Sequence, residues 1–211
     1  MLATGILVII IGYLLGSIPF AYIAGRLIKG VDIRQVGGGN VGTVNTMREI
    51  GTVAGLAVLL ADMGKGVLTV FIAQWLGVSI VFIFTVGLAA VVGHSWPVFL
   101  KFKGGKGGAT TMGVLLALAP VEFAISFAIT VIVVLVTSNI RLGMGVGLAF
   151  LPLIIWGFGG ETSLIIYSLA LPLFLGLRSI PAIKQEWASS GDKKGLIVDR
   201  HFTPWQKRKK Q

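Results

Sequence analysis

Long apolar segments with almost no charge are the feature of this 211-residue sequence that most limits how it can fold. No charged residue precedes Arg26, and the segments 107–140 and 142–177 contain only one each. The segment 51–100 contains two. A helix needs roughly 20 apolar residues to cross the hydrocarbon core of a bilayer, which is about 30 Å thick. We therefore expect an all-α, polytopic membrane protein rather than a water-soluble enzyme.

The lengths of these segments predict the number of crossings. Residues 1–25 suffice for one crossing, and the alternative, a cleaved signal peptide, lacks a basic region before its apolar run. The other segments are too long for one crossing, because a helix of about 34 residues extends roughly 50 Å. Each contains turn-forming residues near its middle, namely Gly77-Val78-Ser79, Ala119-Pro120-Val121-Glu122 and 157–161. One helix and three hairpins predict a domain of seven transmembrane helices over residues 1–177.

Basic residues indicate the orientation of these helices. Every Lys and Arg except Lys65 falls in segments that this topology places on one side of the membrane. The positive-inside rule makes that side cytoplasmic, so the N-terminus is expected outside and the C-terminus in the cytoplasm. Residues 178–211 are expected to form a basic cytoplasmic tail that either binds anionic lipids or only anchors the topology. Nucleic acid is not an expected partner despite the net charge of +10, because no folded binding module precedes the tail.

Three segments on the predicted cytoplasmic side, 37–48, 101–111 and 138–143, combine glycine with polar and basic residues. Glycine allows successive backbone N–H groups to form a concave site for anions. The second segment leads directly into a predicted helix, whose N-terminus adds unpaired donors and partial positive charge. We expect these segments to bind phosphate; flexible loops are the alternative interpretation. No Gly-Lys-Ser/Thr sequence completes a nucleotide P-loop, so ATP is not expected.

Candidate site residues follow from these segments. The candidate catalytic residues are Lys106, Arg48 and Ser138. The candidate substrate-binding residues are Gly39, Asn40, Thr43, Asn45, Gly104, Gly105, Gly107, Thr110 and Arg141. The absence of cysteine and the presence of only two histidines argue against a metal site, and no cofactor is expected.

Asp62, Lys65 and His94 are expected to support the site from within the apolar helices. The i, i+3 spacing of Asp62 and Lys65 lets their charges neutralise one another inside the bundle. The alternative for this pair is a structural role near the helix end, with the side chains reaching toward the membrane surface. For His94 the alternatives are a general base and a hydrogen-bonded structural histidine.

Four groups of motifs occur in order along residues 10–185. They are Gly16-Ser17-Ile18-Pro19; Gly39-Asn40, Gly42-Thr43, Asn45 and Arg48; Asp62 with Lys65-Gly66; and 93–97 followed by 102–107 and Ala109-Thr110. Together they resemble the bacterial acyl-phosphate:glycerol-3-phosphate acyltransferases, seven-span enzymes of the inner (plasma) membrane.

The resemblance implies an activity. The expected reaction moves a fatty acyl group from acyl-phosphate to the 1-hydroxyl of sn-glycerol 3-phosphate, giving lysophosphatidic acid at the cytoplasmic face for phospholipid synthesis. It also implies that a substrate phosphate helps to take the hydroxyl proton, while the protein supplies position and charge. In agreement, the His-x4-Asp dyad of coenzyme-A-dependent acyltransferases is absent, since Phe99 and Gln206 stand at the Asp positions. The expected partners are acyl-phosphate, glycerol 3-phosphate and membrane lipids.

Four positions depart from the family pattern. Gly38 and Arg141 replace serines, Ser179 replaces a histidine, and Ala182 replaces an asparagine. These replacements motivate an alternative function, a catalytically impaired relative that binds phosphorylated lipid precursors or regulates their synthesis. A small transporter of anionic metabolites is a third possibility, but transporters place their sites near the membrane midplane, whereas the cations here lie at one face.

Overall fold

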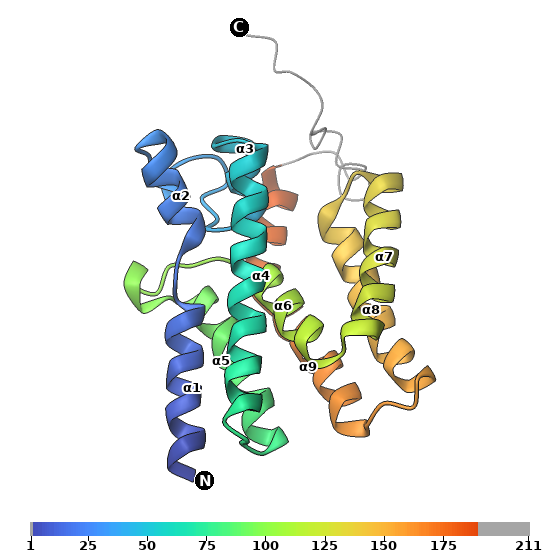
Figure 1. Cartoon of the computed structure of the whole chain (residues 1–211). Helices are drawn as coiled ribbons and strands as arrows, with labels where there is room; N and C mark the ends of the chain where they lie inside the picture. The colour runs from blue at the N-terminus through green and yellow to red at the C-terminus, as the bar shows by residue number, and fades with distance from the viewer. Residues whose placement is uncertain (1, 190–211) are drawn as a thin grey trace, which may run out of the picture. The chain divides into compact units, whose positions relative to one another are not determined.

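A computed structural model describes residues 2–189, apart from the side chains of residue 141 and residues 181–189 (Figure 1). Of the expected basic tail, residues 190–211 lie outside this range. The described chain is helical, with no β-strand between residues 2 and 189. Its elements are α1 (Leu2–Gly16), α2 (Phe20–Lys29), the 3-10 turn η1 (Ile33–Gln35), α3 (Thr43–Glu49), α4 (Thr52–Trp75), α5 (Ile80–Ser95), the 3-10 turn η2 (Val98–Leu100), α6 (Gly108–Leu118), α7 (Pro120–Thr137), α8 (Ile140–Gly157) and α9 (Thr162–Ser189).

The three predicted turns occur where the sequence places them. Helix α4 ends at Trp75 and α5 begins at Ile80, α6 and α7 meet at Ala119, and residues 158–161 separate α8 from α9. Five helical segments of the described chain are long and apolar enough to cross a membrane, and α6 and Leu142–Gly157 are shorter apolar helices. An all-helical membrane protein is therefore confirmed, whereas seven crossings remain a prediction.

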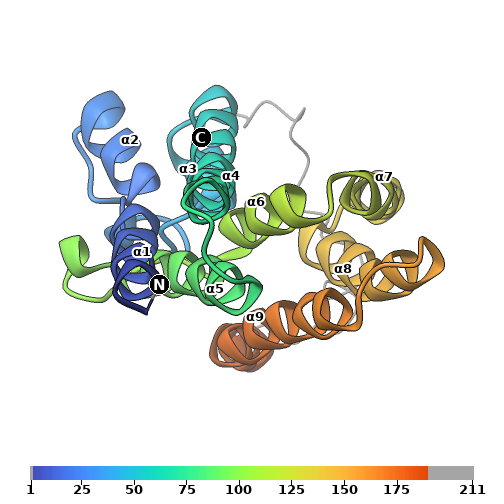
Figure 2. The same ribbon diagram turned by 60° about the horizontal axis from the view of Figure 1, so that its bottom comes forward.

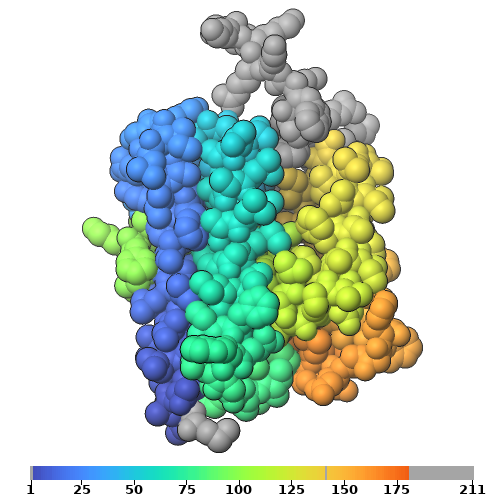
Figure 3. Space-filling view, viewed as in Figure 1, coloured from blue at the N-terminus to red at the C-terminus, as the bar shows by residue number. Residues whose placement is uncertain are grey.

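The described helices form two compact units, residues 2–120 with α1–α6 and residues 121–189 with α7–α9. In the first unit, α4 contacts α1, α2, α3, α5 and α6. Figure 3 shows α1, α2 and α4 together on one face of this unit. Large apolar side chains remain exposed on this unit, for example Leu60 and Trp75 on α4. Such surfaces are costly in water but suit a lipid environment.

Glycines set the packing of α1 against α5, which lie side by side in both ribbon views (Figure 2). A Cβ atom on Gly16 would clash with the backbone of Ala90, and one on Gly12 would press against Val86. Small residues allow close approach of membrane helices, which associate through van der Waals packing rather than a hydrophobic effect.

The first apolar segment contains a break that we did not predict. Instead of one helix over residues 1–25, α1 ends at Gly16 and α2 begins at Phe20. Pro19 has no backbone N–H to continue the helix, and both the backbone N–H and the hydroxyl of Ser17 donate to the carbonyl of Tyr13. The break exposes carbonyl groups at the end of α1 inside the unit.

Helix α6 crosses the middle of α4 through two more glycines. A Cβ on Gly66 would clash with the carbonyl of Thr110, and one on Gly113 would clash with the backbone of Met63. Because Thr110 lies in the first turn of α6, the glycine segment before α6 is close to the middle of α4 and not to its end.

In the second unit, α7 and α8 are joined by a buried polar contact. The hydroxyl of Ser126 donates to the carbonyl of Gly147 at 2.8 Å. Leu151, Ile155 and Leu171 are buried in this unit.

Candidate functional site

The first glycine segment is shaped by Asn45, which lies in α3 and is 5% exposed. Its amide nitrogen donates to the carbonyls of Ile33 and Val36, both at 3.1 Å. Its amide oxygen accepts the backbone N–H of Gly38 at 3.0 Å. We expected Asn45 to contact substrate, but these contacts occupy its amide with the loop itself. Asn45 thus fixes the conformation of residues 36–42, which form the first loop.

Two glycines of this loop are required by its geometry. Gly37 and Gly39 have φ angles of 58° and 66°, in the left-handed region that side chains disfavour. Gly38 differs, because its φ is not positive and a Cβ there would meet no atom within 4 Å. The serine that the family pattern has at this position would therefore fit.

Helix α3 follows the loop and carries further candidates. Thr43 is its first residue, and Arg48 lies exposed in its last turn. The Thr43 hydroxyl is buried and has no hydrogen-bond partner among residues 2–189. Asn40 lies just before the helix and is half-buried.

The second glycine segment lies directly on the end of α5. The N–H of Gly105 donates to the carbonyl of His94 at 3.1 Å. A Cβ on Gly104 would clash with that carbonyl, and one on Gly105 would clash with the His94 ring at Nε2. Glycine is therefore required at both positions for close approach.

The two segments meet at a backbone contact. The carbonyl of Val41 occupies the space where a Cβ of Gly105 would lie. The loop between η1 and α3 thus touches the residue that precedes Lys106, which is half-buried. Gly107 then takes a φ of 88° and caps α6 at its N-terminus.

Buried hydroxyl groups accompany this junction. Besides Thr43, the hydroxyls of Ser95, Thr110 and Thr111 are buried without a hydrogen-bond partner in the described part of the chain. Thr110 and Thr111 lie in the first turn of α6, and Ser95 follows His94. An unsatisfied buried polar group costs about 1–3 kcal/mol, so such groups favour a ligand that bonds to them.

The third predicted segment lies at the α7–α8 junction of the second unit. Ser138 has a φ of 54°, and the side-chain oxygen of Asn139 accepts the N–H of Leu142 at 3.1 Å. Asn139 thereby caps the N-terminus of α8, in whose first turn Arg141 lies. Ser179 and Ala182 both lie on α9 of the same unit. The roles expected for Ser138 in catalysis and for Arg141 in substrate binding remain predictions.

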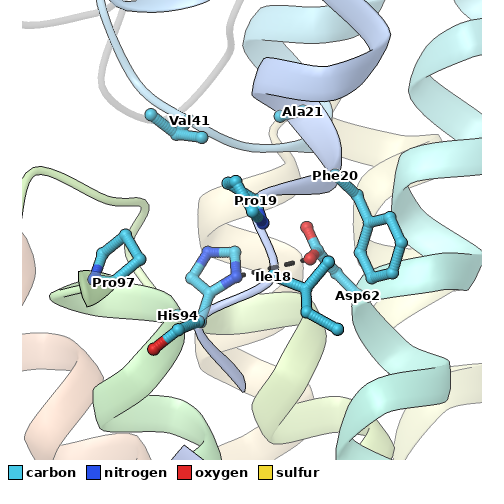
Figure 4. Close-up of a pocket in the computed structure, with 9 residues that line it drawn as sticks. Ile18, Pro19, Phe20, Ala21, Val41, Asp62, His94 and Pro97 are labelled. Atoms are coloured by element: carbon cyan, nitrogen blue, oxygen red, sulfur yellow. Dashed lines mark ion pairs between the residues drawn. The ribbon is translucent and has the colours of Figure 1, made fainter. Parts of the chain in front are cut away.

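Asp62, Lys65 and His94 form a buried charged cluster in the first unit (Figure 4). The Lys65 ammonium lies 2.7 Å from Asp62 Oδ1, 3.0 Å from His94 Nδ1 and 2.9 Å from the carbonyl of Ile18. His94 Nδ1 is also 3.4 Å from Asp62 Oδ1. These residues are 1–8% exposed, so the expected ion pair is present and is enclosed by the protein.

The hollow beside this cluster is lined by the segment 17–19 between α1 and α2, by α2, α4 and α5, by Val41 of the first loop, and by Pro97. Figure 4 shows Pro19, Val41 and Pro97 around the His94 ring. The hollow is too tight to hold a water molecule. The three residues are buried beside it, which suits a structural or positioning role.

A second ion pair, which the sequence analysis missed, holds the entry to the first loop. Arg34 forms a bidentate ion pair with Asp32 through two nitrogens of its guanidinium group, with Nη2–Oδ2 at 2.7 Å and Nε–Oδ1 at 3.0 Å. Arg26 approaches the same carboxylate at 3.7 Å. Hydrogen bonding to Arg34 lowers the pKa of Asp32 to about 2. The Asp-x-Arg spacing was a usable signal, because Asp32 also caps η1 by accepting the N–H of Arg34.

Comparison with known proteins identifies relatives over nearly the whole chain. The family model described as glycerol-3-phosphate acyltransferase matches residues 6–188. Glycerol-3-phosphate acyltransferase 1 of Dehalococcoides mccartyi is 39% identical over 93% of this chain and 97% of its own length. Glycerol-3-phosphate acyltransferase 2 of Moorella thermoacetica is 41% identical over 90% of this chain and 97% of its own.

Solved structures give the same result for the fold. The crystal structure of PlsY, an integral membrane glycerol 3-phosphate acyltransferase, superimposes in its glycerol 3-phosphate form with a TM-score of 0.80 at 32% identity. The alignment covers 88% of this chain and 92% of that one. The lysophosphatidic acid form of PlsY superimposes with a TM-score of 0.78 at 31% identity.

Proposed function

Because this chain belongs to the glycerol-3-phosphate acyltransferase family, we infer that it is a membrane enzyme that transfers a fatty acyl group to glycerol 3-phosphate in phospholipid synthesis. The family match covers the glycine segments and the charged cluster alike. It favours an active enzyme over a relative that only binds phosphorylated lipid precursors.

We propose acyl-phosphate as the acyl donor and lysophosphatidic acid as the product. The 1-hydroxyl oxygen of glycerol 3-phosphate attacks the acyl carbon, the bond from that carbon to the phosphate oxygen breaks, and inorganic phosphate leaves. The hydroxyl proton passes to a substrate phosphate oxygen. The chain supports this scheme because its first unit offers backbone donors and cations, and no His-x4-Asp dyad, for the reaction.

We assign the phosphate group of glycerol 3-phosphate to the junction of the first two glycine segments. Lys106 and Arg48 supply positive charge, and the N–H groups of Gly104–Gly107 and the start of α6 supply further donors. The hydroxyls of Thr43 and Thr110, buried without partners among residues 2–189, are additional ligands. The observation that carries this assignment is the contact between Val41 and Gly105, which joins the two segments next to Lys106.

The remaining candidates are assigned either to a structural role or to the second substrate, acyl-phosphate. Gly39 and Asn40 border the first segment, and Asn45 holds its shape. We propose that Ser138 and Arg141 take part in binding acyl-phosphate. An arginine at position 141 offers two parallel donors to phosphate, which a serine does not.

We propose seven crossings, an outer N-terminus, a cytoplasmic C-terminus and a cytoplasmic active face in the bacterial inner membrane. Support comes from the segregation of Lys and Arg and from the apolar helices of the described chain. Helix α6 has 11 residues, and at 1.5 Å per residue it extends about 16 Å, half of a bilayer core. The glycine segment before α6 would then lie within the cytoplasmic half of the membrane, close to the donor's alkyl chain.

The test is turnover by the purified protein in detergent or lipid cubic phase. Acyl-phosphate and glycerol 3-phosphate are supplied, phosphate release is followed, and lysophosphatidic acid is identified by mass spectrometry. We expect Lys106→Ala to raise the KM for glycerol 3-phosphate by about tenfold or more, the loss expected for a charge-assisted contact. Lys103→Ala, an exposed lysine of the same segment, is the matched control and should behave as wild type.

Three outcomes separate the hypotheses. Wild-type kinetics in Lys106→Ala would refute the assignment of the phosphate site. Binding of glycerol 3-phosphate without turnover would favour the catalytically impaired relative. Product formation that requires acyl-coenzyme A would refute acyl-phosphate as the donor.

A further inference from the structure

We propose that Asp62, Lys65 and His94 are positioning residues that hold the glycine segment 104–107, and with it Lys106, in the geometry that binds phosphate. The inference rests on the proposed function only for the identity of the ligand. Its structural part concerns how a buried charged cluster fixes a loop.

The Lys65 ammonium contacts polar groups from three different parts of the first unit. It donates to the carbonyl of Ile18 beyond α1, forms an ion pair with Asp62 of its own helix α4, and lies within hydrogen-bond distance of His94 at the end of α5. Lys65 is 4% exposed, so water does not compete for these contacts. A single cation therefore ties together the ends of α1 and α5 at the middle of α4.

The contact with Lys65 orients the His94 ring. A protonated Lys65 can only donate, so with this charge state we assign Nδ1 of His94 as the acceptor at 3.0 Å and place the hydrogen of the neutral ring on Nε2. Lys65 thereby prevents rotation of the imidazole. The other side of the ring, at Nε2, faces Gly105.

The fixed histidine forms the surface on which the glycine segment lies. The His94 carbonyl accepts the N–H of Gly105 at 3.1 Å, while the ring occupies the space beside the Gly105 Cα atom. On its other side, Gly105 meets the Val41 carbonyl. Gly105 is thus held between His94 and the first loop, and Lys106 is the next residue in the chain.

Two features indicate that this arrangement serves the site and not stability alone. Removing charges from water is costly, and an apolar pair of similar size is often at least as stable as a buried ion pair. In addition, the cluster contacts the glycine segment at the residue next to Lys106, where a displacement would change phosphate binding directly.

The test uses variants that avoid leaving a lone buried charge. Asp62→Asn/Lys65→Met removes both charges together, and His94→Asn retains an oxygen near the Nδ1 position but lacks the ring face beside Gly105. We expect both to raise the KM for glycerol 3-phosphate by about tenfold, with a change of less than about twofold in the KM for acyl-phosphate. Thr69→Val, which removes a buried hydroxyl of α4 that bonds only to Gly66, is the control and should leave both KM values unchanged.

Hydrogen exchange provides a readout that needs no substrate. Amides of residues 104–107 should exchange faster in both variants, whereas those of α7 and α8 should retain wild-type rates. Unchanged exchange together with an unchanged KM in folded His94→Asn would overturn the proposal. If the wild-type protein shows no turnover but the variants exchange faster, the positioning role is supported and the proposed reaction is refuted. Failure of this inference can therefore be told apart from failure of the proposed function.

Discussion

Replacing Gly105 by alanine tests whether the two glycine segments form one site. The added Cβ would overlap the Val41 carbonyl and the His94 ring. The carbonyl belongs to a loop that Asn45 holds by three hydrogen bonds, and the ring is held by Lys65. Neither neighbour can move without breaking a buried contact, so the segment itself must shift.

The size of the effect follows from this lack of free space. Overpacking a closed site costs about 1–3 kcal/mol. If the shift displaces Lys106 from the phosphate, the same free energy is lost from substrate binding. The KM for glycerol 3-phosphate should then rise by roughly 5- to 150-fold, since about 1.4 kcal/mol corresponds to a factor of ten.

The assay is phosphate release at varied glycerol 3-phosphate with saturating acyl-phosphate, accompanied by thermal unfolding in the same detergent. Gly64→Ala is the matched control, because Gly64 is exposed on α4 and a Cβ there meets no atom within 4 Å. Wild-type KM and stability in Gly105→Ala would refute the close contact between the segments. An equal loss in Gly64→Ala would show that the effect is not specific to the loop.

Three further changes have defined outcomes. Asp32→Asn should lower the free energy of unfolding at pH 7 but not near pH 2. Because the pKa of Asp32 is lowered to about 2, the stability that its carboxylate contributes is complete above about pH 4 and is lost as the pH falls through 2. Screening at the exposed Arg26 and the half-buried Arg34 limits this contribution to about 1–2 kcal/mol, measured as the difference in melting temperature between variant and wild type across pH. Gly66→Ala should lower the melting temperature through overpacking of about 1–3 kcal/mol against α6, whereas Gly64→Ala should not; equal melting temperatures would contradict the observed helix crossing. Gly38→Ser should fold normally because its side chain enters open space, and it should lower the KM for glycerol 3-phosphate if a serine hydroxyl at this position binds phosphate; an unfolded variant would refute the loop conformation.

Much of the fold was predictable because the membrane imposes simple rules on a sequence. The helix ends could be located from three features of the sequence. These are the lengths of the apolar segments, the scarcity of charged residues within them, and the turn residues at 77–79, 119–122 and 157–161. The break at Ser17–Pro19 was missed because the apolar run continues through it, and the charge count that defined the first segment does not register a proline.

The candidate site was only partly predictable. Asp62 and Lys65 are three residues apart on one helix, so their pairing followed from local geometry. The involvement of His94 in the same cluster did not, because it joins from another helix. Asn45 was assigned to substrate, whereas its amide shapes the first loop. No local pattern distinguishes an asparagine that bonds a ligand from one that bonds its own backbone.

The sequence by itself determined that the chain is a helical membrane protein with glycine-rich, basic segments suited to phosphate, because hydrophobicity and charge act residue by residue. The tertiary structure alone decided that the Val41 carbonyl meets Gly105 and that one ammonium joins Ile18, Asp62 and His94. These contacts depend on backbone atoms and on helices distant in the chain. Their positions are set by close packing at glycines, which leaves no periodic signal in the sequence.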